Sequence, residues 1–215
     1  MSLLARRHLS RDPDFAALIL RSARPNLKPQ ARSPYEALVR SIAHQQLHGR
    51  AAEAILARFV SLFGGILPND AEPGPFPDPG VVLAMDPARL RGCGFSASKI
   101  LAIQDICAKT LDGTVPDRRA AGRLSDTALI ERLTTIRGVG RWTVEMVLIS
   151  TLGRPDVLPV DDFGVREGYR LLYGLDVQPK PRELGTIGEA WAPWRSFAAW
   201  YLWRASDAGK RPKPA

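Results

Sequence analysis

The sequence predicts an almost all-α protein, and three observations support this prediction. Apolar residues recur every three or four positions along most of the chain, which is the spacing of one helical face. Gly, Pro and Asn/Asp gather in short segments between these stretches, where they would end helices. The chain has 215 residues and is 45% hydrophobic, which is enough for one large or two small folded cores.

The predicted helices follow one another along the whole chain. In order, the apolar spacing centres them on 15–19, 38–42, 55–60, 100–106, 129–136 and 144–148, with further helical patterns at 163–172 and 197–203. Breaks fall at 24–34, 64–80, 91–96, 137–140, 153–159 and 174–181. For the whole chain we expect roughly nine or ten helices.

The segment 64–80 holds five prolines and four glycines, too many for a helix and too few residues for a domain. We expect a loop inside one domain there. "RGCGFSASKI" and "RGVGRWTVEM" both have Gly-x-Gly at the start of a helical pattern, but the shared part is too short to be an internal repeat.

The charge balance favours a polyanionic partner. Lys and Arg number 30 against 22 acidic residues, a formal net charge of +8, which suits nucleic acid or an anionic membrane surface, although charge that only keeps the protein soluble is the alternative. No apolar run approaches the ~18 residues of a membrane span. The first fifteen residues carry acidic side chains and no apolar signal region, so we expect a mature cytoplasmic protein.

Metal and disulfide chemistry is not predicted. The two cysteines, Cys93 and Cys107, form no Cys-x-x-Cys pattern and cannot build a disulfide framework, a four-cysteine zinc site or an iron–sulfur cluster. His44 and His48 have the spacing of a metal pair, but the Glu of a His-Glu-x-x-His site is missing between them.

The stretch "IRGVGRWTVEM", residues 136–146, predicts a tight turn between two helices. Gly138 and Gly140 permit positive φ and leave the backbone bare, so amides of the turn and the dipole of the following helix could approach a phosphate. A glycine turn that only joins two core helices has the same pattern. The hairpin therefore indicates phosphate binding only together with other signals.

A second signal is "LPVDDFGV", about twenty residues later. Asp161 or Asp162 should cap the helical pattern that begins at Phe163, and a simple cap with a solvated neighbour is the alternative to a catalytic role. A carboxylate held at a helix start, beside an aromatic ring in a basic protein, suits chemistry at a sugar C1′. There it would stabilise a developing oxocarbenium ion and orient water.

Five ordered motifs resemble the helix-hairpin-helix DNA glycosylases, in particular the 3-methyladenine DNA glycosylase II (alkylbase) branch. They lie at 35–55, 94–100, 133–149, 156–168 and 191–203. The resemblance implies an all-α, two-lobed fold with the active cleft between the lobes. Some members carry an extra N-terminal β domain, which we do not expect here because the helical pattern begins by about residue 12. One lobe would comprise 34–153 with the hairpin, and the other 1–33 plus 154–215 with the catalytic Asp.

The resemblance also assigns the chemistry. The family's catalytic acid is the second of the pair, directly before the aromatic, which makes it Asp162 here and leaves Asp161 as the alternative. Relatives that also cut the strand carry a lysine two positions after the second glycine, where Trp142 stands in this sequence. The resemblance therefore implies a monofunctional enzyme that uses water and leaves an abasic site.

The base pocket implied by the resemblance contains Trp142, Phe163 and Trp203, with Met146 where some members carry a tyrosine. A positively charged alkylpurine would stack on these rings by cation–π attraction of about 0.5–2 kcal/mol. The alternative for the three aromatics is an ordinary place in the core. A softer pocket with Met146 should discriminate less by stacking.

Two loops are expected to contact DNA. The hairpin would do so through Gly138, Val139, Gly140 and Thr143. The "IAHQQLHG" turn resembles the family segment whose side chain fills the gap left by a flipped nucleotide. The resemblance makes Gln46 the candidate wedge, with its neighbours Gln45 and Leu47 as alternatives, and His48 could contact a phosphate.

The implied partner is double-stranded DNA with a damaged base, bound by a monomer in the nucleoid and not at a membrane. No cofactor and no iron–sulfur cluster are expected, and the hairpin is a candidate site for a monovalent cation. Two rivals are considered. Asp162 argues against a non-catalytic DNA-binding or damage-sensing protein, and the missing lysine and cysteines argue against a glycosylase for oxidised or mismatched bases.

Overall fold

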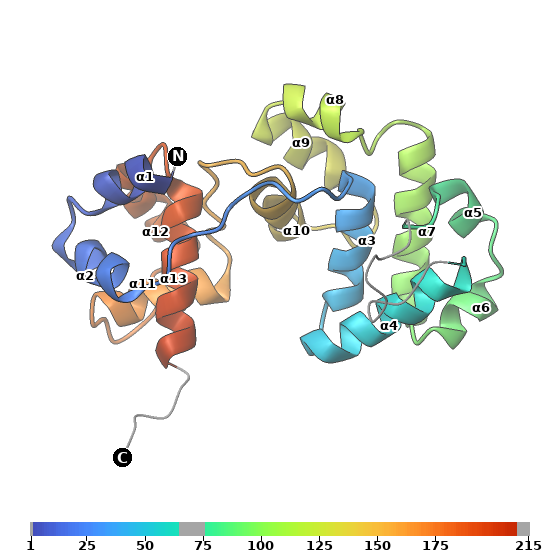
Figure 1. Cartoon of the computed structure of the whole chain (residues 1–215), viewed down its shortest axis with the longest axis horizontal. Helices are drawn as coiled ribbons and strands as arrows, with labels where there is room; N and C mark the ends of the chain where they lie inside the picture. Colours follow the sequence, from blue (N-terminus) through green and yellow to red (C-terminus); the bar gives the residue numbers. More distant parts are fainter. Residues whose placement is uncertain (1, 65–75, 210–215) are drawn as a thin grey trace, which may run out of the picture. The chain divides into compact units, whose positions relative to one another are not determined.

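The computed structural model describes residues 2–64 and 76–209, and within them it contains only helices and connecting segments (Figure 1). The all-α prediction is confirmed. The chain divides into two compact units: Met1–Gln30 with Leu148–Ala215, and Ala31–Val147. The predicted lobes had their boundaries after residues 33 and 153. Each unit is described by itself below.

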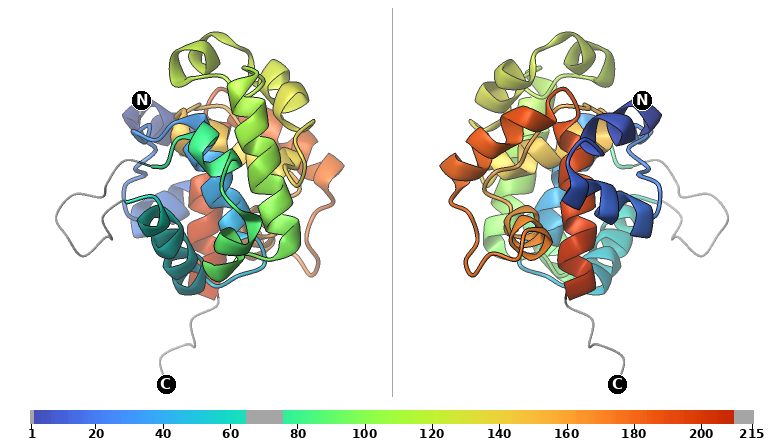
Figure 2. Two further views of the ribbon diagram at one scale, coloured as in Figure 1. Left: turned by 90° about the vertical axis from the view of Figure 1, so that its right-hand side faces the viewer. Right: turned by 90° about the vertical axis from the view of Figure 1, so that its left-hand side faces the viewer.

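The unit Ala31–Val147 is built around α7. Its helices are α3 (Pro34–His44), α4 (Gly49–Leu62), α5 (Pro79–Leu83), α6 (Pro87–Gly92), α7 (Ala97–Leu111), α8 (Arg118–Arg123), α9 (Asp126–Leu133) and α10 (Arg141–Met146). Helices α3, α5 and α6 pack on α7, and α3 also packs on α4 and α10 (Figures 1 and 2). Its core includes Leu38, Ile42, Phe59, Ile103 and Ile106.

Helix starts in this unit are fixed by local capping. Ser33, Ser96, Asp117 and Ser125 each precede a helix, and each side-chain oxygen accepts a hydrogen bond from a backbone amide three residues later. Such a cap is worth about 1 kcal/mol. These four helices therefore begin where the sequence supplies a short polar residue.

The unit of 1–30 and 148–215 is built around α13 (Arg195–Gly209). Its other elements are α1 (Ser2–Leu9), α2 (Pro13–Arg21), the π-helical segment Val147–Thr151, which begins one residue before the unit, α11 (Phe163–Leu172), α12 (Pro181–Ile187) and the 3₁₀ turn Gly188–Trp191. Helices α1, α2 and α11 pack on α13, as the right-hand view of Figure 2 shows. Phe197, Tyr201 and Leu202 lie in the core.

Helices α11 and α13 approach each other closely at Gly168. A Cβ atom on this glycine would lie 1.9 Å from the carbonyl oxygen of Leu202, a distance that no side chain tolerates. The backbone of α13 therefore rests directly on α11 at this point. This close approach carries Trp203, the residue after Leu202, to the beginning of α11.

All six predicted breaks separate helices, but several short helices were not predicted. Helices α1, α5, α6, α8 and α12 have eight residues or fewer, too few turns for an apolar repeat to stand out. Of the predicted loop at 64–80, residues 65–75 lie outside the described residues, and α5 already begins at Pro79 with Asp78 as its cap. Within 2–64 and 76–209, no helix has the length and apolar character that crossing a membrane requires.

Candidate functional site

The predicted hairpin is the turn between α9 and α10. Gly138 has a φ of 75°, and a Cβ there would lie 3.1 Å from Cβ of Ala102 and 3.5 Å from Cδ1 of Ile42. Gly140 caps α10 with a φ of −91° and a ψ of 168°, and a Cβ there would meet no atom within 4 Å. The left-handed backbone that both glycines permit is thus used at Gly138 alone.

The other two predicted hairpin residues point their side chains inward. Val139 and Thr143 are 4% and 3% exposed. The Val139 amide donates to the carbonyl of Ile136, which closes the turn. Any contact of Val139 or Thr143 with a ligand would therefore have to use the backbone.

Gln46 has an unusual backbone conformation in the turn between α3 and α4. Its φ of 57° is the one positive value found among the non-glycine residues that the structure describes, and its side chain is exposed. Such strain costs of the order of 1–3 kcal/mol and tends to cluster at functional sites. Leu47 beside it is 40% exposed, whereas Gln45 is half-buried and its Nε2 donates to the carbonyl of Gly138 at 3.1 Å. Gln45 therefore links this turn to the hairpin.

Helix α7 holds both of these loops. The ammonium of Lys99 donates to the carbonyls of Ala43 and Gln45, each at 2.8 Å, and burial lowers the pKa of Lys99. Six residues further along α7, the carboxylate of Asp105 accepts from the backbone amide of Arg137 at 2.7 Å. The α3–α4 turn and the hairpin are thus fastened to one helix, a role that was not predicted for either Lys99 or Asp105.

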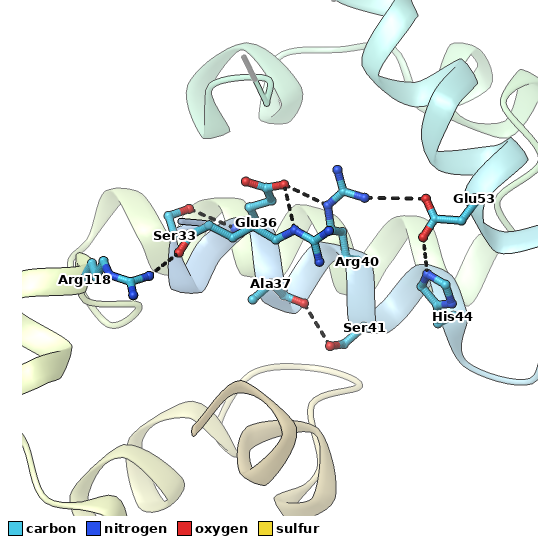
Figure 3. A network of polar contacts seen from close by, with 9 residues as sticks. Ser33, Glu36, Ala37, Arg40, Ser41, His44, Glu53 and Arg118 are labelled. Carbon is cyan, nitrogen blue, oxygen red and sulfur yellow. Dashed lines mark hydrogen bonds and ion pairs between the residues drawn. The ribbon is translucent and has the colours of Figure 1, made fainter. Parts of the chain in front are cut away.

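A network of charged side chains connects α3 and α4 (Figure 3). Glu53 on α4 accepts from Nε2 of His44 at 2.9 Å, and its other oxygen lies 3.7 Å from Arg40. Arg40 in turn bonds Glu36 at 2.8 Å. His44 is therefore engaged by Glu53, while His48 is exposed at the start of α4, and the described part of the chain holds no group of three potential metal ligands.

Asp162 is the N-cap of α11. Its Oδ1 accepts from the backbone amide of Val165 at 2.8 Å and from the indole Nε1 of Trp203, also at 2.8 Å. The side chain is half-buried, whereas Asp161 is exposed. Of the two acids, Asp162 is therefore the one that the fold holds in a defined orientation.

The segment before Asp162 is tied to the beginning of α13. Asp156 forms a two-oxygen ion pair with Arg195, with both N–O distances at 2.7 Å. The hydroxyl of Ser196 bonds the carbonyl of Arg154 at 2.7 Å and accepts from the amide of Val157 at 2.9 Å. These contacts were not predicted, because they join residues about forty positions apart and no local pattern marks them.

The predicted pocket residues lie in both units. Trp142 and Met146 share α10, where Trp142 is 43% exposed and Met146 is half-buried. Phe163 begins α11 and is 63% exposed, and Trp203 is half-buried beside Asp162. The structure thus joins Asp162 and Trp203 directly.

A buried acid on α10 was also missed. Glu145 is 2% exposed, and its Oε1 accepts from Nε of Arg141 at 2.9 Å, one turn earlier and directly after Gly140. The spacing of Arg141 and Glu145 is the sequence signal that could have revealed the pair. The pair fixes the side chain of the first residue of α10.

Known proteins share both the sequence and the fold. The family described as HhH-GPD superfamily base excision DNA repair protein matches residues 39–193. The chain is 45% identical over 191 residues to DNA-3-methyladenine glycosylase 1 of Schizosaccharomyces pombe, covering 89% of this chain and 80% of that one.

Two solved structures extend the comparison. A 3-methyladenine DNA glycosylase of Schizosaccharomyces pombe in complex with abasic DNA superposes with a TM-score of 0.82 at 44% identity, covering 97% of this chain and 99% of that one. A DNA-3-methyladenine glycosidase of Bacillus halodurans gives 0.80 at 33% identity, with coverage of 94% and 89%. The family match covers the hairpin, Asp162, nearly all of the unit 31–147 and residues 148–193 of the other unit, and the chain therefore belongs to the HhH-GPD superfamily of base excision DNA repair proteins.

Proposed function

We propose that this protein is a monofunctional DNA glycosylase, which excises alkylated purines of the 3-methyladenine type from double-stranded DNA and leaves an abasic site. The observation that carries the proposal is the carboxylate of Asp162, held at the start of α11 by two donors to Oδ1. The relatives named above act on 3-methyladenine in DNA according to their names, and one of them is bound to abasic DNA.

The chemistry follows from the charge of the carboxylate. When the N-glycosidic bond breaks, its electron pair leaves with the base, and positive charge develops on C1′ and the ring oxygen of the sugar. A fixed carboxylate beside that sugar stabilises the cation. Water then bonds to C1′ and passes a proton to Asp162 or to solvent, which completes the hydrolysis.

Alkylated purines are suitable substrates for this arrangement. A base that carries a positive charge departs as a neutral molecule, so its departure needs no protonation by the enzyme. Phe163 and Trp142, both substantially exposed, offer aromatic faces on which an electron-poor base would stack. The reaction assigned to Asp162 and water requires neither a metal ion nor an organic cofactor.

DNA binding is assigned to the hairpin and the α3–α4 turn, the two loops that are hydrogen-bonded to α7. The amides of the hairpin at Gly138 and Gly140 would grip a phosphate, and Gln46 would fill the gap left by the flipped nucleotide. The absence of a lysine at the position of Trp142 means that no amine is available there to attack C1′. The strand should therefore remain intact.

Mass analysis of released bases tests the proposal. The purified protein is incubated with methylated, deaminated and etheno-containing duplex DNA, and the Asp162→Asn variant is assayed in parallel. Release of 3-methyladenine by the wild type, and its loss in the variant, supports the proposal. Binding to DNA without release of any base would instead identify a damage-sensing protein. Release of deaminated bases alone would show that the substrates are deaminated bases and not alkylated purines.

A further inference from the structure

Trp203 lies against the carboxylate of Asp162, and its indole N–H points at Oδ1. We propose that Trp203 is a positioning residue for Asp162, and that Gly164 provides the space in which the indole reaches the carboxylate. The inference rests on the proposed function, since it assigns a role to two residues around the acid that carries that function. It replaces the stacking role that the sequence predicted for Trp203.

The two donors to Oδ1 come from different helices. The amide of Val165 belongs to the first turn of α11, and the indole belongs to α13, forty-one residues after Asp162. A single cap would still allow the carboxylate to turn about its side-chain bonds. Two donors at 2.8 Å from different directions fix the oxygen in place, as a catalytic group requires.

Gly164 lies where any side chain would separate these two partners. A Cβ atom on it would be 2.9 Å from Cδ1 of Trp203 and 3.2 Å from Oδ1 of Asp162. It would also be 3.4 Å from Nε1, the nitrogen that makes the hydrogen bond. Real Cβ atoms essentially never approach a carbon as closely as 2.9 Å, so the indole would have to move.

One turn later, Gly168 fixes the backbone that carries Trp203. The carbonyl oxygen of Leu202 lies where a Cβ on Gly168 would be, so α13 cannot be drawn away from α11 without losing this packing. Gly164 thus receives the indole, and Gly168 receives the backbone just before it. The two glycines, at i and i+4 on one face of α11, place the indole N–H at the carboxylate.

The two roles of Trp203 predict different results. A residue that stacks the flipped base through its ring keeps most of its function as phenylalanine, and its effect differs between charged and neutral lesions. A residue that orients Asp162 through its N–H loses its function as phenylalanine, and its effect is the same for both lesions. Its effect also disappears once the charge of Asp162 has been removed.

The test measures single-turnover excision from duplex DNA carrying either a cationic N-methylated purine or a neutral ethenoadenine. The variants are Trp203→Phe and Gly164→Ala, each alone and combined with Asp162→Asn. Trp200→Phe controls for aromatic loss on α13, and Gly185→Ala controls for adding a methyl group, because a Cβ there meets only Cγ1 of Val160 at 3.9 Å. Thermal melting and DNA affinity are recorded for every variant.

We expect Trp203→Phe to slow excision about tenfold to a hundredfold for both lesions, the effect of losing one hydrogen bond to a charged group. Gly164→Ala should slow it by a similar factor with unchanged DNA affinity, and neither control should change it. In the Asp162→Asn background, Trp203→Phe should cause no further loss.

Three results would overturn the assignment: wild-type rates in Trp203→Phe, slowing of the cationic lesion only, or a full additional loss in the Asp162→Asn background. Gly164→Ala keeps the test decisive if Trp203→Phe does not fold, because it retains both partners and only displaces the indole. If the wild type releases no base at all, the proposed function fails, and this outcome is distinct from failure of the positioning role.

Discussion

Replacing Asp162 by asparagine removes the negative charge at the start of α11 and leaves an acceptor oxygen in the same place. The amide oxygen can still accept from Val165 and Trp203, the two donors found at 2.8 Å. A hydrogen bond to a charged acceptor is worth about 1 kcal/mol more than one to a neutral acceptor, so folding should lose at most about 2 kcal/mol. Asparagine is also as good an N-cap as aspartate.

The expected loss of rate is much larger than this loss of stability. Removing a positioned catalytic acid or base lowers the rate by about 10²–10⁴, equivalent to roughly 3–5 kcal/mol of transition-state stabilisation. A domain of ordinary stability, about 5–15 kcal/mol, stays folded after losing 2 kcal/mol. The variant should therefore be folded, bind DNA at least as tightly as the wild type, and excise slowly.

Single-turnover release of 3-methyladenine from duplex DNA measures the rate, and fluorescence anisotropy on uncleaved DNA measures the affinity. Asp161→Asn is the matched control, because Asp161 is exposed and directly precedes Asp162. If Asp162→Asn excises at a near wild-type rate and Asp161→Asn excises slowly, the catalytic carboxylate is that of Asp161. Full activity of both variants would refute the mechanism.

Three further predictions concern the DNA-binding loops and the product. Gly140→Val should weaken binding to all DNA sequences alike and leave thermal stability unchanged, because a Cβ there meets no protein atom. Gly138→Val should weaken DNA binding and also lower the melting temperature, because the φ of Gly138 is 75°. Unchanged DNA affinity in Gly140→Val would contradict phosphate binding by the hairpin. Gln46→Ala should slow excision of stably paired lesions more than of mismatched ones, measured in the same single-turnover assay, and equal slowing would exclude the wedge role. With Trp142 in place of a lysine, the product strand should break only after treatment with alkali, and borohydride should trap no covalent enzyme–DNA adduct. Both results are read on a denaturing gel. Scission of the strand by the pure enzyme without alkali would disprove monofunctional action.

The sequence predicted the features that depend on neighbouring residues. The helix breaks, the turn at 137–140 and the helix start after Asp162 are all local, because glycine, proline and short polar side chains act within a few positions. The cap by Asp162 is an example, since the acid and the amide of Val165 are three residues apart.

The features that sequence reasoning missed depend on contacts between distant segments. Nothing near Trp203 indicates that its N–H bonds Asp162, and nothing near Gly164 indicates that an indole occupies the space beside it. The left-handed backbone of Gln46 was also unforeseen, because glutamine has no preference for it. Contacts of this kind become visible only once the helices are assembled.

The attachment of two loops to α7 has a mechanical consequence. When a glycosylase bends DNA to extrude a nucleotide, the duplex exerts a restoring torque on the residues that hold it. In the proposed complex this torque acts on the hairpin and on the Gln46 turn, and the bonds of Asp105 and Lys99 pass it to a single rigid helix of fifteen residues. Because both loops are bonded to α7, this helix would keep the distance between the bound phosphate and the wedge constant while the bent DNA exerts force on both loops.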